Sequence, residues 1–322
     1  MDEFFIIAVD IGGTSFRVAL ADASGNILAR NARPTHAHEG YQRGLERITE
    51  TIRETAATVD FREVRGIAVA SAGPIDPKSG SILTPPSLPG WHNAPLKDSL
   101  NSAFGIPVLV ESDADMAAVG EHRFGAGRGF DRLIYMTVST GIGGGIIIDG
   151  ELLRGSKVSA AEIGHMIVDP KGPVCNCGGR GHLEPVASGT AIARMASERL
   201  SPKDSGKLAE MCGGDLSILT AKIVAEAASA EDSLANEVMS EAGSSLGLAI
   251  TSLIHIFDPE VVIIGGGVAN AGELILDPIR RVIAERAMPD FKDRTRVTQS
   301  ALGDDSGIMG AIAFALEELR LD

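Results

Sequence analysis

The sequence FFIIAVDIGGTSFRVALA, residues 4–21, consists of two apolar runs joined by a turn that contains Asp10, Gly12, Gly13 and Thr14. Continuous apolar runs are typical of buried strands, so the stretch predicts a hairpin. Glycines let an anion approach the backbone closely, and the amides and the Thr14 hydroxyl could then bind phosphate. Asp10 would lie near a phosphate-bound Mg²⁺. The alternative is a plain hairpin turn, in which paired glycines are common.

The same pattern returns at residues 133–148, LIYMTVSTGIGGGIII. A buried strand leads into a turn with Thr140, Gly141, Gly143 and Gly144, and a second apolar strand follows. We expect this turn, like the first, to bind phosphate. One glycine-rich hairpin is a weak signal, and neither turn matches the Walker A pattern. The duplication, with an aspartate between its two copies, is much stronger evidence than either turn alone.

That aspartate is Asp113, which follows a short apolar strand at residues 108–111. An aspartate at the carboxyl end of a parallel strand is well placed to be a catalytic base. Phosphoryl transfer to a hydroxyl needs such a carboxylate to accept the proton. The alternative is that Asp113 or Asp115 caps a helix beginning at Met116. We assign the cap to Asp115 and the chemistry to Asp113.

Residues 162–184, EIGHMIVDPKGPVCNCGGRGHLE, combine possible metal ligands with glycines that allow a tight fold. The four possible ligands are His165, Cys175, Cys177 and His182. Such side chains suit a tetrahedral zinc ion. Cys-x-Cys alone is a weak motif, and isolated histidines are often surface residues, so the residues alone leave the metal open.

Taken together, these motifs resemble those of a known family. The turn Asp-x-Gly-Gly-Thr is similar to the first phosphate motif of the actin-like ATPase superfamily. The segment 162–184 resembles the signature of the ROK family of sugar kinases and sugar-responsive repressors. The matching residues are Gly164, His165, Cys175, Cys177, Gly178, Gly181 and Glu184. His182 stands where that family usually has a third cysteine, and histidine can also bind zinc.

The resemblance implies an α/β, two-lobed actin-like ATPase (ribonuclease H-like) fold with duplicated βββαβα units. The small N-terminal lobe would comprise residues 1–115 plus 305–322, and the large lobe residues 116–304. The resemblance also implies an adenosine-binding turn at Gly265, Gly266 and Gly267. It further implies a set of sugar contacts, namely Gly73, Ser87, Ser112, Asp113, Glu162, His165 and Glu184. Ser87 and Ser112 replace asparagines that usually contact sugar hydroxyls.

The activity implied by this resemblance is ATP-dependent phosphorylation of a hexose, with Mg²⁺ and a structural Zn²⁺. Glucose is the first expectation, giving glucose 6-phosphate. N-acetylmannosamine or another N-acetylhexosamine is the alternative, because serine leaves room for a larger substituent. A non-catalytic sugar-sensing ROK protein is the alternative of a different class. ROK repressors carry a helix-turn-helix before the first phosphate loop, and only nine residues precede Asp10 here.

The composition of the chain argues against nucleic acids and membranes as binding partners. The 322 residues carry a net charge of −14, which would repel nucleic-acid phosphates. Three cysteines do not form a disulfide framework, and residues 4–9 are too short to span a membrane. We therefore expect a cytoplasmic protein that binds a small sugar, neither nucleic acid nor membrane, and forms a homodimer or a dimer of dimers.

Periodicity predicts the remaining elements. Apolar residues at helical spacing indicate helices near residues 41–58, 187–199, 234–256 and 305–319. Apolar runs indicate strands at residues 66–70 and 260–264. Trp91, the only tryptophan, could line the sugar pocket, but we expect it in the core of the small lobe because tryptophan is so often buried.

Overall fold

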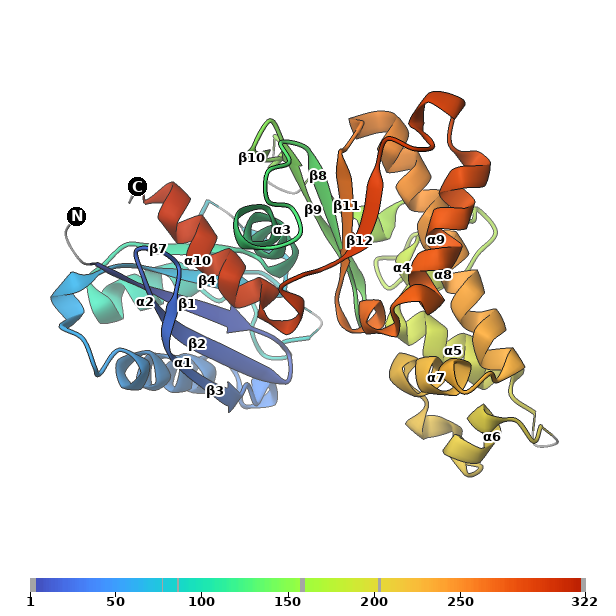
Figure 1. Cartoon of the computed structure of the whole chain (residues 1–322). Helices are drawn as coiled ribbons and strands as arrows, with labels where there is room; N and C mark the ends of the chain where they lie inside the picture. The colour runs from blue at the N-terminus through green and yellow to red at the C-terminus, as the bar shows by residue number, and fades with distance from the viewer. Residues whose placement is uncertain (1–3, 77, 86, 157–159, 202–203, 320–322) are drawn as a thin grey trace. The chain divides into compact units, whose positions relative to one another are not determined.

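The computed structural model describes residues 4–76, 78–85, 87–156, 160–201 and 204–319. These residues form two compact units, and each contains one five-stranded sheet (Figure 1). Unit 1 comprises the described residues within 1–128, 154–158 and 304–322, and unit 2 comprises those within 129–153 and 159–303. The boundary predicted after residue 115 lies inside helix α3 (Asp113–Phe124), all of which belongs to unit 1.

The sheet of unit 1 has the strand order β3-β2-β1-β4-β7. The first three strands form an antiparallel meander, and β4 and β7 run parallel to β1. The predicted hairpin is present. The strands are β1 (Phe5–Ile11), β2 (Ser15–Asp22), β3 (Ile27–Pro34), β4 (Val64–Ser71) and β7 (Val108–Ser112), with a separate two-stranded ribbon of β5 (Ile75–Asp76) and β6 (Ser81–Ile82).

Helices cover both faces of this sheet. Alternate residues of β1, such as Ile7 and Val9, share one apolar cluster with Ile48 of α1 (Tyr41–Thr55) and Leu100 of α2 (Leu96–Phe104). Trp91 is fully buried in this cluster, as expected from the sequence. The 3₁₀ turns η1 (Ala37–Glu39) and η2 (Phe61–Glu63) flank α1. Because strand residues alternate in direction, β1 and β4 present a second face, against which α3 and α10 (Ser306–Glu318) pack.

The contact between α3 and α10 depends on two glycines. A Cβ at Gly120 would lie 2.7 Å from the backbone nitrogen of Gly310, and a Cβ at Gly310 would lie 1.9 Å from the Met116 carbonyl oxygen. No other residue would fit without a backbone shift. The C-terminal helix is thereby fixed against the helix that carries Asp113.

Unit 2 repeats the topology. Its sheet has the order β10-β9-β8-β11-β12, again three antiparallel strands followed by two parallel ones. The strand predicted at 133–138 is confirmed with the same bounds. The strands are β8 (Leu133–Val138), β9 (Ile142–Ile148), β10 (Glu151–Leu152), β11 (Val261–Gly265) and β12 (Arg296–Gln299).

The helices of unit 2 pack around α8 (Ser233–Phe257), which contributes residues such as Leu246 and Ile250 to the core. The helix predicted at 187–199 corresponds to α5 (Gly189–Arg199). It begins two residues later than predicted, because Ser188 is extended and caps α5 through the Ala191 amide, and Ala187 ends the separate short helix α4 (Glu184–Ala187). The remaining helices and turns are α6 (Lys207–Cys212), α7 (Ala221–Ser229), α9 (Glu273–Arg286), η3 (Ile163–His165), η4 (Leu216–Ile218), η5 (Gly267–Ala271), η6 (Pro289–Phe291) and η7 (Gly303–Asp305). Among the described residues, no helix combines the length and apolar character that crossing a bilayer requires.

Candidate functional site

One edge of the unit 1 sheet gathers the predicted residues of that unit. The register pairs Ile11 with Ser71 on β4, and Ser71 in turn with Ser112 on β7. Because these three strands are parallel neighbours, the segments that follow them start at the same edge. The turn of Gly12, Gly13 and Thr14, the residue Gly73 and the residue Asp113 therefore lie beyond adjacent strand ends.

Asp10, the last polar residue of β1 before the turn, is paired with Arg17. The two residues lie directly opposite each other in the antiparallel register, and the guanidinium donates to the Asp10 carboxylate. Desolvation raises the pKa of Asp10, and the charge and hydrogen bond of Arg17 oppose that rise. The start of α10 also lies close, since a Cβ at Gly307 would be 2.7 Å from the Asp10 Cγ. A helix N-terminus is a favourable neighbour for a carboxylate.

Asp113 is the first residue of α3. Its side chain is exposed, but the surrounding protein atoms desolvate the carboxyl, and this effect, followed by the negative charge of Asp10, raises the pKa of Asp113 to about 6. A carboxyl group of that pKa is ionised at neutral pH yet more basic than a free aspartate, which suits a proton acceptor.

The prediction that Asp115 caps this helix is wrong. Ser112 is the N-cap: its Oγ accepts from the Asp115 amide at 3.2 Å and donates to Asp115 Oδ2 at 2.8 Å. Ser112 therefore caps α3, so the helix begins at Asp113 and not at Met116. The Ser112 hydroxyl is therefore already committed to the helix.

Ser87 lies beside the first turn. A Cβ at Gly13 would be 2.6 Å from the Ser87 carbonyl oxygen, so a larger residue at position 13 would push the two segments apart. Trp91 is not exposed to a ligand; its ring packs edge-on against Tyr41, with centroids 5.3 Å apart. Its indole nitrogen is buried and has no hydrogen-bond partner among the described residues.

The second turn, between β8 and β9, is held by contacts to its backbone. The Ser139 amide donates to the Gly141 carbonyl at 2.8 Å, and the Thr190 hydroxyl donates to the Thr140 carbonyl at 2.8 Å. The Thr140 side chain is exposed. Glu184 Oε2 accepts from the Ile142 amide at 3.0 Å, so the predicted sugar ligand Glu184 also fastens this turn.

Gly143 and Gly144 lie in strand β9, opposite Thr137 and Met136, and not in the turn itself. A Cβ at Gly144 would be 2.2 Å from the Ile163 side chain. The structure therefore gives Gly144 a packing role, and a phosphate role for these two glycines stays a prediction.

A cavity of about 700 Å³ opens within unit 2, beside Thr140 and Gly267. A volume of this size is typical of small-molecule sites and would hold a nucleoside. Its walls come from α5, α7, η5 and the residue before α7. The other lining residues include Thr190, Ala193, Thr220, Lys222, Val268 and Asn270.

The glycine turn after β11 forms one side of that cavity through Gly267 alone. A Cβ at Gly267 would meet no atom within 4 Å, whereas one at Gly265 would lie 2.1 Å from the Tyr135 hydroxyl. Gly266 has a φ of 79° and packs against the Val138 carbonyl. Two of the three predicted glycines therefore allow β11 to pack, and the third faces open space.

The predicted metal ligands form one cluster. The ligand atoms of His165, Cys175, Cys177 and His182 all lie within 4.8 Å of one another. The two Nδ1 atoms of the histidines are 3.3 Å apart, Cys177 Sγ lies 3.3 Å from His182 Nδ1, and Cys175 Sγ lies 3.7 Å from His165 Nδ1. Glu162 is nearby, with Oε2 3.9 Å from His165 Nε2.

Comparison with known proteins identifies the family. The model of the ROK family matches residues 6–318. The chain belongs to the ROK family. It is 40% identical to a glucokinase of Thermotoga maritima, over 99% of both chains. It is 28% identical to a xylose repressor of Caldicellulosiruptor bescii, covering 98% of this chain and 78% of the repressor.

A solved structure of a ROK glucokinase from Streptomyces griseus, described in complex with glucose and AMPPNP, superposes with a TM-score of 0.83. It is 35% identical, and the match covers 96% of this chain and 98% of that one. The predicted family and the predicted actin-like ATPase fold are confirmed.

The residues of this ROK chain fit a zinc ion. In a tetrahedral site with Zn–N of about 2.0 Å and Zn–S of about 2.3 Å, ligand atoms are separated by roughly 3.3–3.8 Å. Three of the six separations between the ligand atoms, 3.3, 3.3 and 3.7 Å, fall within that range, and all four atoms lie within 4.8 Å of one another. Both histidines would bind through Nδ1, which leaves Nε2 of His165 for another partner.

Two features of this ROK site were not predicted from the sequence. Arg17 was missed, although counting back from the turn places it opposite Asp10. The cavity walls from α5, α7 and η5 were missed because their residues carry no motif and meet only through tertiary packing.

Proposed function

We propose that this ROK protein transfers the γ-phosphoryl group of ATP to a hexose hydroxyl, with glucose as acceptor and glucose 6-phosphate as product. The observation that carries the proposal is the position of Asp113. It follows β7, and the neighbouring parallel strands β4 and β1 lead at the same edge to Gly73 and to the first phosphate turn. The similarity of the chain to glucokinases of Thermotoga maritima and Streptomyces griseus supports glucose as the acceptor.

In this mechanism Asp113 accepts the proton of the attacking hydroxyl. The hydroxyl oxygen forms the new bond to the γ-phosphorus, the bond to the β–γ bridging oxygen breaks, and ADP leaves with that electron pair. The raised pKa of Asp113 suits a group that must take up a proton at neutral pH. At a typical aspartate pKa the same transfer would be less favourable.

The donor phosphates would contact the backbone amides and hydroxyls of the two turns, including Thr14 and Thr140. Mg²⁺ bound to the phosphates would neutralise part of their charge. Asp10 is the acidic residue at the first turn that would hold it, with the Arg17 guanidinium bonded to its carboxylate. The adenosine would lie in the 700 Å³ cavity beside Gly267.

On the acceptor side, a zinc ion bound to Nδ1 of His165 would fix the imidazole ring and its tautomer. Nε2 would then be protonated and would donate to a sugar hydroxyl. Glu162, whose carboxylate lies 3.9 Å from that nitrogen, would accept from a neighbouring hydroxyl. The metal would affect sugar affinity without taking part in the transfer.

A second candidate acceptor is an N-acetylhexosamine such as N-acetylmannosamine. The observation in its favour is that the Ser112 hydroxyl is committed to Asp115 and offers the sugar no free amide-like group. That arrangement leaves space for a larger substituent on the sugar.

The decisive experiment is an ADP-release assay with Mg-ATP over a panel of hexoses and N-acetylhexosamines, using the wild type and Asp113→Asn. We expect turnover with glucose and a loss of at least about 10³-fold in the variant. Turnover only with an N-acetylated sugar would show that the acceptor is an N-acetylhexosamine and not glucose. If the wild type binds sugar but releases no ADP, the proposed kinase function is wrong and a sugar-sensing role takes its place.

The proposal includes the homodimer expected from the sequence. Sedimentation velocity at micromolar concentration would distinguish a dimer from a monomer or a tetramer.

A further inference from the structure

The first phosphate turn is held from behind by Thr35. This residue is 1% exposed and lies just after β3. Its Oγ1 donates to the Gly12 carbonyl at 2.7 Å, and its amide donates to the Thr14 carbonyl at 2.9 Å. Both carbonyls are thus turned toward Thr35. Since a phosphate is repelled by carbonyl oxygens and attracted by amides, this arrangement favours an anion on the opposite side of the turn.

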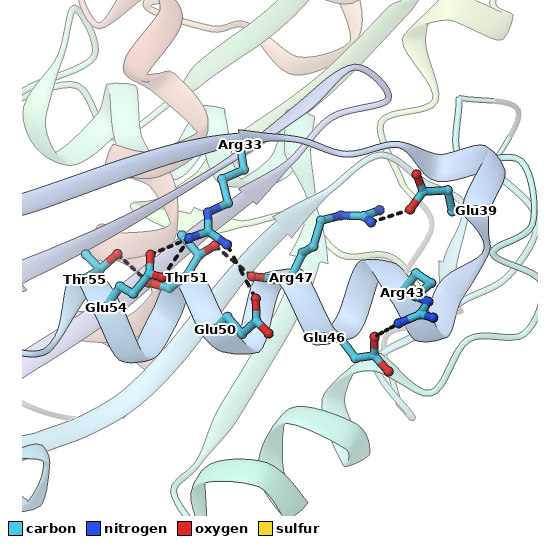
Figure 2. A network of polar contacts seen from close by, with 9 residues as sticks. All are labelled: Arg33, Glu39, Arg43, Glu46, Arg47, Glu50, Thr51, Glu54 and Thr55. Carbon is cyan, nitrogen blue, oxygen red and sulfur yellow. Dashed lines mark hydrogen bonds and ion pairs between the residues drawn. The ribbon is translucent and has the colours of Figure 1, made fainter.

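Arg47 on α1 in turn holds Thr35. Its Nη2 donates to the Thr35 carbonyl at 2.5 Å and reaches the His36 carbonyl at 3.4 Å, while Nη1 bonds Glu39 at 2.6 Å. Figure 2 shows the side chain extended from α1 toward Glu39. One guanidinium therefore fixes both ends of the segment 35–39, which includes His36 in a left-handed conformation with φ of 46°.

The same segment also contacts the part of the chain that carries Ser87. A Cβ at Gly90 would lie 3.2 Å from the Gly40 Cα and 3.4 Å from the Ala37 carbonyl. Ser87 itself lies against Gly13. Segment 35–39, together with Gly40, therefore supports both the Gly12–Thr14 turn and the stretch that carries Ser87. A shift of Thr35 would be transmitted to the backbone of the turn.

We propose that Thr35 and Arg47 are positioning residues for the phosphoryl donor: together they set the backbone geometry of the Gly12–Thr14 turn. This inference rests on the proposed kinase function. Neither side chain needs to touch ATP. Each acts through the chain Arg47, Thr35, Gly12, so its loss should weaken binding of the donor more than binding of the sugar.

The test compares Thr35→Val with Thr51→Val. Thr51 is 0% exposed, and its Oγ1 also donates to a backbone carbonyl at 2.7 Å, but that carbonyl belongs to Arg47 within α1. Both variants thus remove a buried hydroxyl that bonds a backbone carbonyl, and only in Thr35→Val does that carbonyl belong to the turn. We expect Thr35→Val to raise the KM for ATP about fivefold or more, with the KM for glucose within about twofold, and Thr51→Val to change neither.

A second matched pair tests the arginine. Lysine at position 47 cannot bond Thr35 and Glu39 with two separate nitrogens. We expect Arg47→Lys to raise the KM for ATP, whereas Arg43→Lys should not, because Arg43 is exposed and pairs with Glu46 on its own helix, as Figure 2 shows. Thr35→Ser retains the hydroxyl and should restore donor affinity close to that of the wild type.

ATP dissociation constants from calorimetry accompany the kinetics, so that the inference can be judged without turnover. Equal ATP affinity in Thr35→Val and Thr51→Val would overturn the inference even if the wild type is an active kinase. A wild type that turns over no sugar would overturn the proposed function, and the difference in ATP affinity would still decide the role of Thr35. If Thr35→Val does not fold, Thr35→Ser and the arginine pair decide in its place.

Discussion

Arg17 donates to the Asp10 carboxylate from the position directly opposite on the neighbouring strand, and it also bonds the Asp304 carbonyl at the start of the C-terminal segment. Asp10 is largely buried, with 12% of its side chain exposed. Desolvation raises the pKa of this carboxylate, and the Arg17 guanidinium opposes that rise. The pair thus links the first hairpin to the beginning of α10.

We predict that Arg17→Met lowers the free energy of unfolding by about 2 kcal/mol, because it leaves a desolvated carboxylate without its countercharge. Urea denaturation at pH 7 measures the loss. Arg62→Met is the control: Arg62 is 90% exposed and pairs with Asp60 at the surface, so its loss should leave the free energy of unfolding nearly unchanged. Equal losses in both variants would contradict the role given to Asp10. Adding Asp10→Asn to Arg17→Met should recover part of the loss.

The pKa of Asp113 predicts the pH dependence of the reaction. A base must be ionised, so kcat/KM should fall about tenfold per pH unit below a pKa of about 6 and level off above it. The negative charge of Asp10 contributes to the raised value. In Asp10→Asn the acidic limb should therefore move to lower pH, whatever the loss in rate. A limb that stays near pH 4 in the wild type would mean that another group is the base.

The raised pKa of Asp113 suits its role as a base but lowers the stability of the folded protein at neutral pH. The pKa of Asp113 is about 6 in the folded protein and 3.8 in a free aspartate, so between those pH values the folded state binds more protons than the unfolded state. The free energy of unfolding contributed by this group therefore falls as pH rises from about 4 to 6 and stays lower above. We predict that Asp113→Asn is more stable than the wild type at pH 8 and that the gain disappears at pH 3.5, as measured by chemical denaturation.

For the metal cluster we predict about one zinc per chain, measured by elemental analysis of protein purified without added metal. Cys177→Ser should lose the zinc, because it removes one of four ligands. Cys212→Ala should retain it, because Cys212 is buried elsewhere in unit 2 and is not part of the cluster. His182→Cys should also retain it, since thiolate and imidazole are both competent ligands. Wild-type protein without zinc would contradict the prediction directly.

The cavity of unit 2 predicts where the nucleoside binds. Ala193 lines it from α5, so Ala193→Trp should fill the space and raise the KM for ATP more than about tenfold. Ser197→Trp is the matched control on the same helix, at a residue of similar partial exposure that does not line the cavity. If the two variants show the same KM for ATP, the adenosine lies elsewhere.

How far the sequence predicts the molecule depends on the range of the interactions involved. Strand β8 was predicted with correct bounds because its apolar run and the following glycines are local signals. The start of α3 was misplaced because Ser112 and Asp115 both favour caps, and only the geometry shows that serine is the cap and aspartate its partner. Arg17 could have been found from hairpin symmetry.

The cavity could not have been predicted in the same way. Ala193, Lys222 and Asn270 are separated by 29 and 48 residues, and nothing in their neighbourhoods distinguishes them from other helix residues. They meet because α5, α7 and η5 pack around one core. The metal cluster is the contrasting case, because its four ligands lie within 18 residues and glycines between them allow the fold.

The Ser112 cap of α3 also leads to a prediction about sugar choice. Ser112→Ala should destabilise the protein by about 1 kcal/mol, because it removes the cap of α3. Ser112→Asn should keep the cap, since asparagine is an equally good N-cap, and it adds an amide beside Asp113. We therefore expect Ser112→Asn to retain wild-type stability and to lower the KM for glucose several-fold. The KM for an N-acetylated sugar should rise in the same variant. An unchanged ratio of the two KM values would show that position 112 caps the helix and does not select the sugar.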